Sequence, residues 1–441
     1  METIDAKPLK LSLSPNEVAR RLHKRRGFVY LDSADAAADT HHLSILTADP
    51  TCIHTGNLTR DADRLRAALD RHQSETVDCG FPLGGLFGHV AYDGQFTFGE
   101  YESLLAYHHH KDRWYVVGEP SYLDELREAP DNEGLDLSHG SRIQFASDMN
   151  KPDFVQRVTR AQEWIADGDI YQANLAHQFR AKRQPDQEAF ALYEHLRAVS
   201  PAPFSAYFSL DDQQILSSSP ECFLKMSGRG ITTRPIKGTR PRFSDSLLDE
   251  KSAYDLITSP KEVSELIMIT DLERNDLGRI CDYGSVRVRE LLALERYAQV
   301  FHLVSTVQGE LRPDIDHVEA LRLCSPGGSI TGAPKKRAME IIEALEPTPR
   351  GLYTGAIGYL GWNGESQFNI AIRTLIGERD HWHFHVGAGI VADSDPTAEY
   401  EETLHKAAGI LKATDAYCSS VTSIRTKNRS SENSTNSFKS R

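Results

Sequence analysis

The chain has 441 residues and a formal net charge of −13 at pH 7, enough sequence for two domains or one large two-lobed domain. The acidic balance, and the lack of a basic helix interleaved with aromatic residues, argue against a nucleic-acid partner. No segment approaches the about 20 apolar residues of a membrane span, the N-terminus has no signal core, and the six cysteines form no CxxC pair. We therefore expect a soluble, cytoplasmic protein with free thiols and no membrane partner.

The first part of the chain contains short β-branched runs, "FVYLD", "LSILTAD" and "RWYVVG", and the glycine-rich stretch "FPLGGLFGHVAYDG". These predict strands and turns. Residues 124–150 are polar and turn-rich and predict a linker, so we divide the chain into an N-terminal region (1–145) and a second region (150–417). The serine- and asparagine-rich residues 419–441 are expected to be a disordered tail.

A β-hairpin is predicted in "SSSPECFLKMSGRGITTRPIKG", with its turn at Gly228-Arg229-Gly230. If Arg229 is the centre, Glu221 and Lys237 face each other at about 5 Å between Cβ atoms. Other side chains of the first strand are expected in the core: Cys222, Leu224 and Met226. An acid beside an amine can work as a proton donor and a nucleophile. The alternatives are a solvated lysine in a loop or a cross-strand ion pair that contributes little.

Two predicted helices begin at prolines, Pro260 and Pro396, and each carries a Glu-x-x-Glu pair on one face. The four carboxylates are Glu262, Glu265, Glu399 and Glu402. Two such pairs can converge on one Mg²⁺, whereas the lack of accompanying histidine or cysteine disfavours zinc there. The alternatives are a capping-box role for Glu262 and solvated helix faces for the others, with Lys406 on the same stripe as the second pair.

Two glycine motifs do not predict nucleotide binding. "GGSITGAPKK" lacks the Gly-Lys-Ser/Thr ending of a phosphate loop, and "GAGIVA" is followed by "DSDP" where a helix should run. The first can bind an anion through free backbone amides or can be a plain helix start at Pro334. The second can bring the backbone close to a ligand or can be a tight turn at a strand end.

Several segments between residues 168 and 403 together resemble the chorismate-utilising enzymes. They occur in the family's order: "GDIYQANL", "SSSPECFL", "RPIKGTRPR", "LIMITDLERNDLGRI", "HLVSTVQG", "SPGGSITGAPKKRAMEIIEALEP", "YTGAIGYL", "IAIRTL" and "GAGIVADSDPTAEYEET". Within the family they look like aminodeoxychorismate synthase component I, the sibling of anthranilate synthase component I. The resemblance implies an α+β fold in which two large antiparallel sheets pack face to face, with helices outside and an active cleft between lobes.

The resemblance also implies the site. Glu265 and Glu402 match the family's Mg²⁺ ligands, with Glu262 and Glu399 beside them. The positions that bind or line the substrate are Tyr353, Arg373, His302, Thr331, Lys406 and the backbone of Gly387, Ala388 and Gly389. Lys237 and Glu221 match the catalytic nucleophile and acid. Cys222 stands where many relatives have arginine, and we expect it to change packing only.

Lys237 distinguishes the two siblings, because anthranilate synthases resemble this sequence but carry alanine at that position. The expected reaction is amination of chorismate at C4: the lysine amine adds at C2 as the C4 hydroxyl leaves, and ammonia then enters at C4 and expels the lysine. The product is 4-amino-4-deoxychorismate, a precursor of para-aminobenzoate and folate. No Gly-x-Cys-x-Gly elbow of a glutaminase is present, so ammonia is expected from a glutamine amidotransferase subunit in a heterodimer, or from solution.

Three other functions remain as alternatives. The first is anthranilate synthase component I. Isochorismate or salicylate synthesis is disfavoured, because those enzymes need a lysine that activates water where this chain has Gln172. A non-catalytic chorismate-binding regulatory protein is expected to lose Glu221, Lys237 or an acidic pair, and none is lost here.

Overall fold

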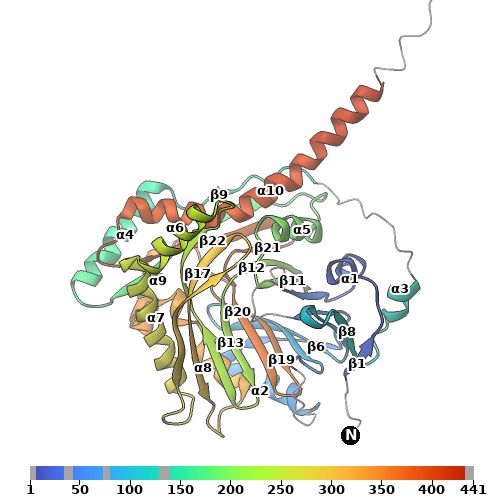
Figure 1. Ribbon diagram of the computed structural model, residues 1–441, viewed down its shortest axis with the longest axis horizontal. Helices are drawn as coiled ribbons and strands as arrows, with labels where there is room; N and C mark the ends of the chain where they lie inside the picture. Colours follow the sequence, from blue (N-terminus) through green and yellow to red (C-terminus); the bar gives the residue numbers. More distant parts are fainter. Residues whose placement is uncertain (1–5, 34–42, 73–79, 129–139, 433–441) are drawn as a thin grey trace, which may run out of the picture.

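The computed structural model describes residues 6–33, 43–72, 80–128 and 140–432, with side chains described to residue 418. Two antiparallel β-sheets with helices on their outer faces make up the chain (Figure 1). The α+β fold with two large sheets that the sequence predicted is confirmed.

The larger sheet has 12 strands. In hydrogen-bonded order they are β1 (Ala6–Leu9), β8 (Arg113–Val117), β7 (Leu104–His108), β3 (Leu43–Thr47), β2 (Val29–Asp32), β11 (Phe204–Leu210), β12 (Gln213–Ser219), β21 (Thr374–Gly377), β22 (His381–Ile390), β10 (Gln172–Lys182) and β18 (Gly332–Ala333), with β9 (Ala146–Ser147) beside β10.

The smaller sheet has 10 strands. Their order is β15 (Ile236–Pro241), β17 (Val300–Glu310), β14 (Gly230–Arg234), β13 (Cys222–Ser227), β20 (Glu365–Ile370), β19 (Ala356–Gly361), β5 (Gly85–Val90), β6 (Gln95–Tyr101) and β4 (Cys52–Asn57), with β16 (Arg287–Arg296) beside β17. Both sheets combine strands from before residue 145 with strands from after residue 150, so the two regions that we distinguished in the sequence fold together.

The helices lie outside the sheets. They are α1 (Pro15–Leu22), α2 (Leu58–Asp70), α3 (Leu123–Glu128), α4 (Lys151–Ala166), α5 (Ala189–Val199), α6 (Ser246–Ile257), α7 (Pro260–Gly278), α8 (His317–Cys324), α9 (Lys335–Leu345) and α10 (Pro396–Glu432), with short 3₁₀ turns η1 (His109–Lys111) and η2 (Gly328–Ile330). None of the helices within the described ranges is both long and apolar enough to cross a membrane.

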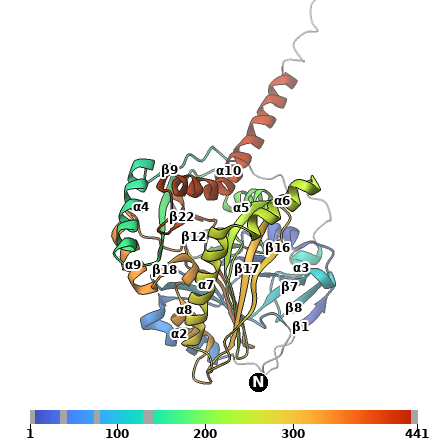
Figure 2. The same cartoon turned by 60° about the vertical axis from the view of Figure 1, so that its left-hand side comes forward.

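The two sheets pack face to face around one apolar layer. Val29 and Phe208 of the larger sheet share a buried cluster with Phe87 and Tyr359 of the smaller one. Because successive side chains of a strand point to opposite faces, Tyr207 lies on the other side of the larger sheet and packs against α1 and α5. These strands are apolar on both faces because helices cover the outside (Figures 1 and 2).

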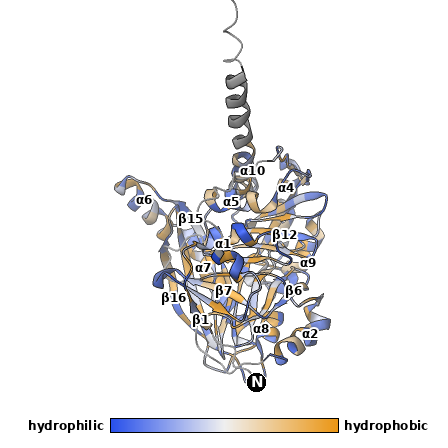
Figure 3. Cartoon of the chain, turned by 90° about the vertical axis from the view of Figure 1, so that its right-hand side faces the viewer, coloured by the Kyte–Doolittle hydropathy of each residue, from blue (hydrophilic) through white to orange (hydrophobic). Residues whose placement is uncertain are grey.

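Each outer face has its own helix layer. Val18 of α1, Tyr193 of α5 and Ala407 of α10 cover the larger sheet, whereas α2 and α8 cover the smaller one. Figure 3 shows hydrophobic colour concentrated on the strands inside the molecule and hydrophilic colour on outward-facing segments such as α1. Helix α7 packs Leu266 against Leu303 of β17, and this contact sets α7 beside the edge strand β15.

Helix α10 extends further than predicted. It continues to Glu432, beyond residue 419 where we expected disorder to begin, and its last part projects away from the body in Figure 1. Residues 433–441 lie outside the described residues. The cysteines of the described residues are free thiols, as predicted, and Cys79 falls outside those ranges.

Candidate active site

The predicted hairpin forms, but its register differs from the prediction. Ser227 pairs with Gly230, so the turn is the two-residue Gly228-Arg229 and not a three-residue loop. Gly228 adopts φ +53, which suits the first position of a two-residue hairpin turn. Glu221 and Lys237 are therefore not cross-strand partners. The core assignment is confirmed for three side chains, all buried: Cys222, Leu224 and Met226.

Lys237 approaches Glu221 by a different route. Pro235 has no N–H to offer a ladder, and after it the chain leaves β13 but continues along β17, where Lys237 lies opposite Leu303. The backbone N–H of Ile236 hydrogen-bonds the Glu221 carboxylate, and the Lys237 charge acts on the same group. The pair predicted from the sequence is thus close in space, although the geometry behind the prediction was wrong.

Glu221 is a buried acid with a perturbed pKa. Burial raises the pKa of its carboxyl to about 7, against the opposing effects of a hydrogen bond from Ser329 and the charges of Lys237 and Arg373. The Ser329 hydroxyl donates to Glu221 Oε1 at 2.7 Å. A carboxyl with this pKa is substantially protonated at neutral pH, so Glu221 can donate a proton to a leaving group.

The Lys237 amine points toward β22 and α7. Its Nζ lies 3.7 Å from Glu265 Oε2, and the side chain is only 19% exposed. A Cβ added to Gly389 of β22 would lie 3.7 Å from the same nitrogen. Strand β15, helix α7 and strand β22 therefore meet at this amine.

Helices α7 and α10 bring the carboxylates of the two predicted Glu-x-x-Glu pairs close enough for their charges to interact. Lys261 lies between them, and its Nζ donates to Glu399 Oε1 at 3.0 Å. Although burial opposes it, this hydrogen bond and the charges of Glu399, Glu265 and Glu402 raise the pKa of Lys261. Burial, together with the neighbouring charges of Glu262 and Glu402, raises the pKa of Glu265.

Two carboxylate oxygens in this group have no hydrogen-bond partner among the described residues. They are Glu265 Oε1 and Glu399 Oε2, and both are buried. A buried acceptor without a partner costs free energy, and oxygen ligands of this kind are what Mg²⁺ prefers. The residues present therefore fit the magnesium ion that the sequence led us to expect.

Of the two alternatives for these acids, the capping box is contradicted by the structure and the solvated helix face holds only in part. Ser259, the residue before α7, makes no side-chain cap, so Glu262 belongs to no capping box. The helix begins at Pro260, which has no N–H to be capped. Glu262 instead lies 3.6 Å from the Arg240 guanidinium. Glu399 is buried and accepts from Ser394 at 2.8 Å. Glu402 on the same face of α10 is 44% exposed and pairs with Lys406, so this face is partly solvated.

Gly387 and Gly389 lie near the C-terminal end of β22 but still within its ladder, and not in a strand-end turn. They pair with Ala176 and Asn174 of β10 in a regular ladder. A Cβ at Gly389 would be 2.3 Å from Gln172 Nε2, and one at Gly387 would be 2.9 Å from the Tyr353 hydroxyl. The absence of a side chain at these positions thus leaves room for the Gln172 amide and the Tyr353 hydroxyl over the strand.

Arg373 and Tyr353 bring polar groups to the same region. Arg373 has φ +49, a conformation uncommon for a residue other than glycine, and burial lowers the pKa of its guanidinium. Within the described ranges no carboxylate lies at ion-pair distance from it, so it is available to an anionic ligand. Burial raises the pKa of the Tyr353 hydroxyl to about 12, and its ring stacks on His385 at 5.2 Å.

His302, Thr331 and Lys406 are held by internal contacts. His302 Nδ1 lies 3.0 Å from Thr239 Oγ1, and burial lowers the pKa of the ring to about 3. The Thr331 hydroxyl donates to the Gly327 carbonyl at 3.0 Å. Lys406 donates to the Gly387 carbonyl at 2.8 Å and pairs with Glu402 at 2.8 Å, which ties α10 to β22.

Two residues of the site were not singled out from the sequence. Ser329 stands inside "GGSITG", a motif that predicts only backbone amides as ligands, and Lys261 stands beside Glu262 in "SPKE". Both are polar residues within motifs identified from the sequence, the glycine-rich loop and the start of the first acidic helix. Neither motif, however, indicates which distant carboxylate each side chain meets.

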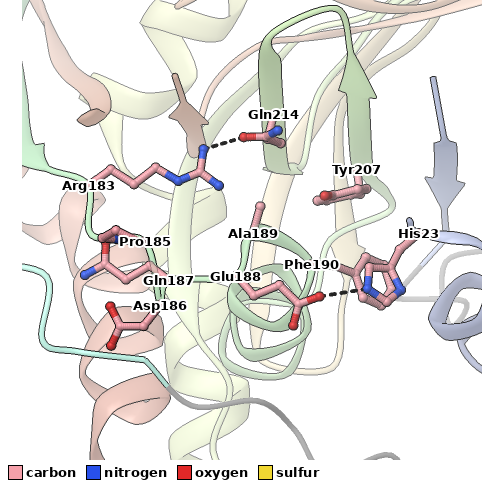
Figure 4. A pocket seen from close by; sticks show the side chains of 10 residues that line it. All are labelled: His23, Arg183, Pro185, Asp186, Gln187, Glu188, Ala189, Phe190, Tyr207 and Gln214. Atoms are coloured by element: carbon pink, nitrogen blue, oxygen red, sulfur yellow. Dashed lines mark hydrogen bonds and ion pairs between the residues drawn. The ribbon is translucent and has the colours of Figure 1, made fainter. Parts of the chain in front are cut away.

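A separate cavity of about 270 Å³ lies between α1 and the start of α5 (Figure 4). His23 pairs with Glu188 across it at 2.8 Å, and Arg183 hydrogen-bonds Gln214. The residues that line it include none of the predicted site residues. The predicted catalytic and binding residues therefore lie around Lys237 and not in this cavity.

The convergence of Lys237, Glu221, the acidic pairs and the β22 glycines agrees with a comparison against known families. A family described as chorismate binding enzyme matches residues 61–412. The chain belongs to this family. The recognition made from the sequence is thus confirmed at family level.

Curated relatives of this chorismate-binding enzyme carry two names. Aminodeoxychorismate synthase component 1 of Bacillus subtilis is 44% identical over 295 residues, covering 67% of this chain and 62% of the relative. Anthranilate synthase component 1 of Synechocystis sp. is 44% identical over 284 residues, covering 62% and 56%. The chain spans less than two thirds of the length of either relative, and identity alone does not separate the two reactions.

Solved structures show the same fold. Anthranilate synthase component I from Streptococcus pneumoniae is similar with a TM-score of 0.75 and 30% identity, covering 90% of this chain and 97% of that one. The menaquinone-specific isochorismate synthase from Escherichia coli has a TM-score of 0.75 at 19% identity, covering 93% and 94%.

Proposed function

We propose that this chorismate-binding enzyme replaces the C4 hydroxyl of chorismate with an amino group and forms 4-amino-4-deoxychorismate, a transaminase-class reaction on the route to para-aminobenzoate and folate. One observation carries the proposal: the Lys237 amine lies over Gly389 of β22, next to Glu265 and close to the acid Glu221. The name of the Bacillus subtilis relative supports the same assignment.

The residues divide the reaction between them. The neutral Lys237 amine forms a bond to C2, the ring electrons shift, and the C4–O bond breaks as Glu221 gives a proton so that water leaves. Ammonia then forms a bond to C4 and its extra proton returns to the Glu221 carboxylate, while the electrons shift back and the C2–N bond breaks to release the neutral Lys237 amine. The sum is chorismate plus ammonia giving the amino product plus water, and the pyruvyl group stays in place.

The substrate's two carboxylates need positive charge and hydrogen-bond donors. Arg373 and Tyr353 supply these at one end, and the amides of the β22 glycines lie beside them. The acidic residues Glu262, Glu265, Glu399 and Glu402 would hold Mg²⁺, which supplies charge for a carboxylate when bound. Gln172, whose amide lies at Gly389, is not a base, and this disfavours activation of water there.

The nitrogen source is proposed to be ammonia delivered by a glutamine amidotransferase subunit in a heterodimer. No glutaminase elbow occurs in the sequence, and ammonia in solution can replace the partner at higher pH.

Product identification tests the proposed function. The purified chain is incubated with chorismate, Mg²⁺ and ammonia, and the products are separated and identified by mass. We expect 4-amino-4-deoxychorismate with its pyruvyl group retained. Anthranilate with free pyruvate as the main products would contradict the assignment and establish the second candidate, which the equally similar Synechocystis relative supports.

A further inference from the structure

A cluster of metal-ligating side chains lies at the other end of β22. Glu378 stands in the loop between β21 and β22, and His381 and His383 are the first and third residues of β22. Alternate residues of a strand share a face, so both rings point to the same side. One ligand atom from each of the three residues lies within 4.8 Å of those of the other two.

We propose that Glu378, His381 and His383 bind a borderline divalent metal ion of the zinc class. Two imidazoles and one carboxylate are a donor set that zinc takes, with a fourth position left for water. The spacing of the ligand atoms is compatible with ligand bonds of about 2.0–2.2 Å converging on one ion. Imidazole nitrogens also favour zinc over Mg²⁺, which prefers oxygen ligands.

A second observation points to a missing ligand. His383 is 8% exposed, and its Nδ1 is buried without a hydrogen-bond partner among the described residues. Buried ring nitrogens normally have a partner, so this orphan nitrogen marks a site with unused binding capacity.

Asp380 contacts His381 from the side of the ring opposite the proposed metal position. Its carboxylate lies 2.7 Å from His381 Nδ1, and His381 Nε2 lies 3.3 Å from Glu378 Oε2. A carboxylate that holds one ring nitrogen fixes the ring and turns the other nitrogen toward the metal. The pair Asp380–His381 is therefore preorganised for ligation.

One nearby positive charge would repel a metal ion bound at this site. Arg180 of β10 lies directly opposite His383 in the ladder and is exposed, whereas Glu378 and Asp380 contribute two negative charges. The local balance still favours a cation. Replacement of Arg180 by a neutral residue should tighten metal binding, because the guanidinium repels the ion.

The site is separate from the Mg²⁺ group. His383 and Gly389 are six residues apart on β22, which corresponds to about 20 Å along a strand. His385 lies between them and stacks on Tyr353, so the intervening face is occupied by rings. Zinc uptake at Glu378 therefore does not depend on the acids of α7 and α10.

Zinc titration of the untagged full chain tests the proposal. Calorimetry with Zn²⁺ is performed with Mg²⁺ in excess, so that the acids of α7 and α10 are already occupied. We expect one tight zinc equivalent, and Co²⁺ in its place should give the visible absorption of a tetrahedral N/O site. Removing a ligand in Glu378→Gln, His381→Gln or His383→Gln should weaken binding roughly tenfold or more, and Asp380→Asn roughly tenfold.

His54→Gln is the matched control. His54 also pairs with a carboxylate, Glu100 at 2.8 Å, but the Arg71 guanidinium pairs with the same carboxylate at 2.9 Å and would repel a metal ion. Its zinc binding should equal that of the parent chain. Because Glu378 is a half-exposed loop residue, its substitution does not threaten the fold. An absence of tight zinc, or zinc binding unchanged in Glu378→Gln and His383→Gln, overturns the proposal.

Discussion

Single residues in this enzyme acquire their chemistry from burial. Glu221 is an ordinary carboxyl in the sequence, yet burial brings its pKa to about 7. Lys237 is one of many lysines, yet its amine lies over β22, where a Cβ added to Gly389 would be 3.7 Å from it. The proposed roles of both follow from these surroundings and not from residue type.

Replacement of the proposed nucleophile is the first test at this scale. Lys237→Ala should lower the rate of C4 amination on the order of 10³-fold or more, because the first bond to C2 can no longer form. Lys225→Ala in β13 of the same sheet is the matched control, since Lys225 is exposed, and it should be fully active. Steady-state kinetics of both variants decide the point, and an alanine variant at position 237 with the parent's rate and product would refute the nucleophile assignment.

The raised pKa of Glu221 makes a pH prediction. Because the folded-state pKa, about 7, lies above the ordinary value of 4.5, the folded protein binds more protons than the unfolded chain between these values. The free energy of unfolding should therefore decrease as pH rises from about 4.5 to about 7, by at most about 1.4 kcal/mol per pH unit from this group. In Glu221→Gln this contribution is absent, which urea denaturation across the range can measure. Parallel pH profiles for the two proteins would contradict the prediction.

At the scale of elements, the site depends on α7 and α10 meeting beside β22. Lys406 fastens α10 to the β22 backbone, and Lys261 of α7 reaches Glu399 of α10. Each helix contributes one acidic pair. The metal that we propose would be held between the two pairs.

Removing one of these carboxylates should weaken the binding of Mg²⁺. Glu402→Gln should raise the Mg²⁺ concentration needed for half-maximal activity about tenfold, because an amide is a poorer ligand for a hard cation. Glu401→Gln is the control, since Glu401 pairs with Lys151 at 2.7 Å away from the other acids. Activity is titrated against Mg²⁺ for both, and coincident curves for Glu402→Gln and the parent would place the metal elsewhere.

The β22 glycines offer a second test on the element scale. Gly389→Ala should lower activity with little loss of fold, because its methyl group meets the flexible end of Gln172 and approaches Lys237. Gly409→Ala in α10 meets nothing closer than 3.4 Å, and it should keep activity and gain about 0.5–1 kcal/mol of stability. Thermal unfolding and kinetics on the two variants separate the cases; equal activities would show that the space over Gly389 is not used.

At the scale of the whole molecule, the chain carries the proposed chorismate chemistry but no glutaminase elbow. Alone it should form product from ammonia, faster as pH rises and more neutral ammonia is available, and none from glutamine. Addition of the matching amidotransferase subunit should make glutamine a substrate at neutral pH, because ammonia is then released close to the site. Product assays with glutamine as the only nitrogen source measure this. Turnover by the chain alone would reveal a glutaminase that the sequence does not indicate.

Much of the site could be predicted from local sequence patterns. The helix starts at Pro260 and Pro396 are where the proline and glutamate spacing put them, and the buried face of β13 follows the alternation of its residues. The hairpin register could not be predicted from the sequence, because Gly228-Arg229 and Gly228-Arg229-Gly230 are both acceptable turns. Pairing of Lys237 with β17 depends on a segment more than sixty residues away.

The sequence by itself determined the family, the strand-rich α+β class and the identities of the acids, the lysine and the glycines, because motif order and local periodicity depend on neighbours in the chain. Only the tertiary structure decided that the first 145 residues share both sheets with the rest, that Glu399 is buried beside Lys261, and that His383 has an unpaired ring nitrogen. These facts arise from contacts between distant segments. Burial and charge, which set pKa values and metal affinity, are properties of those contacts and have no local sequence signal.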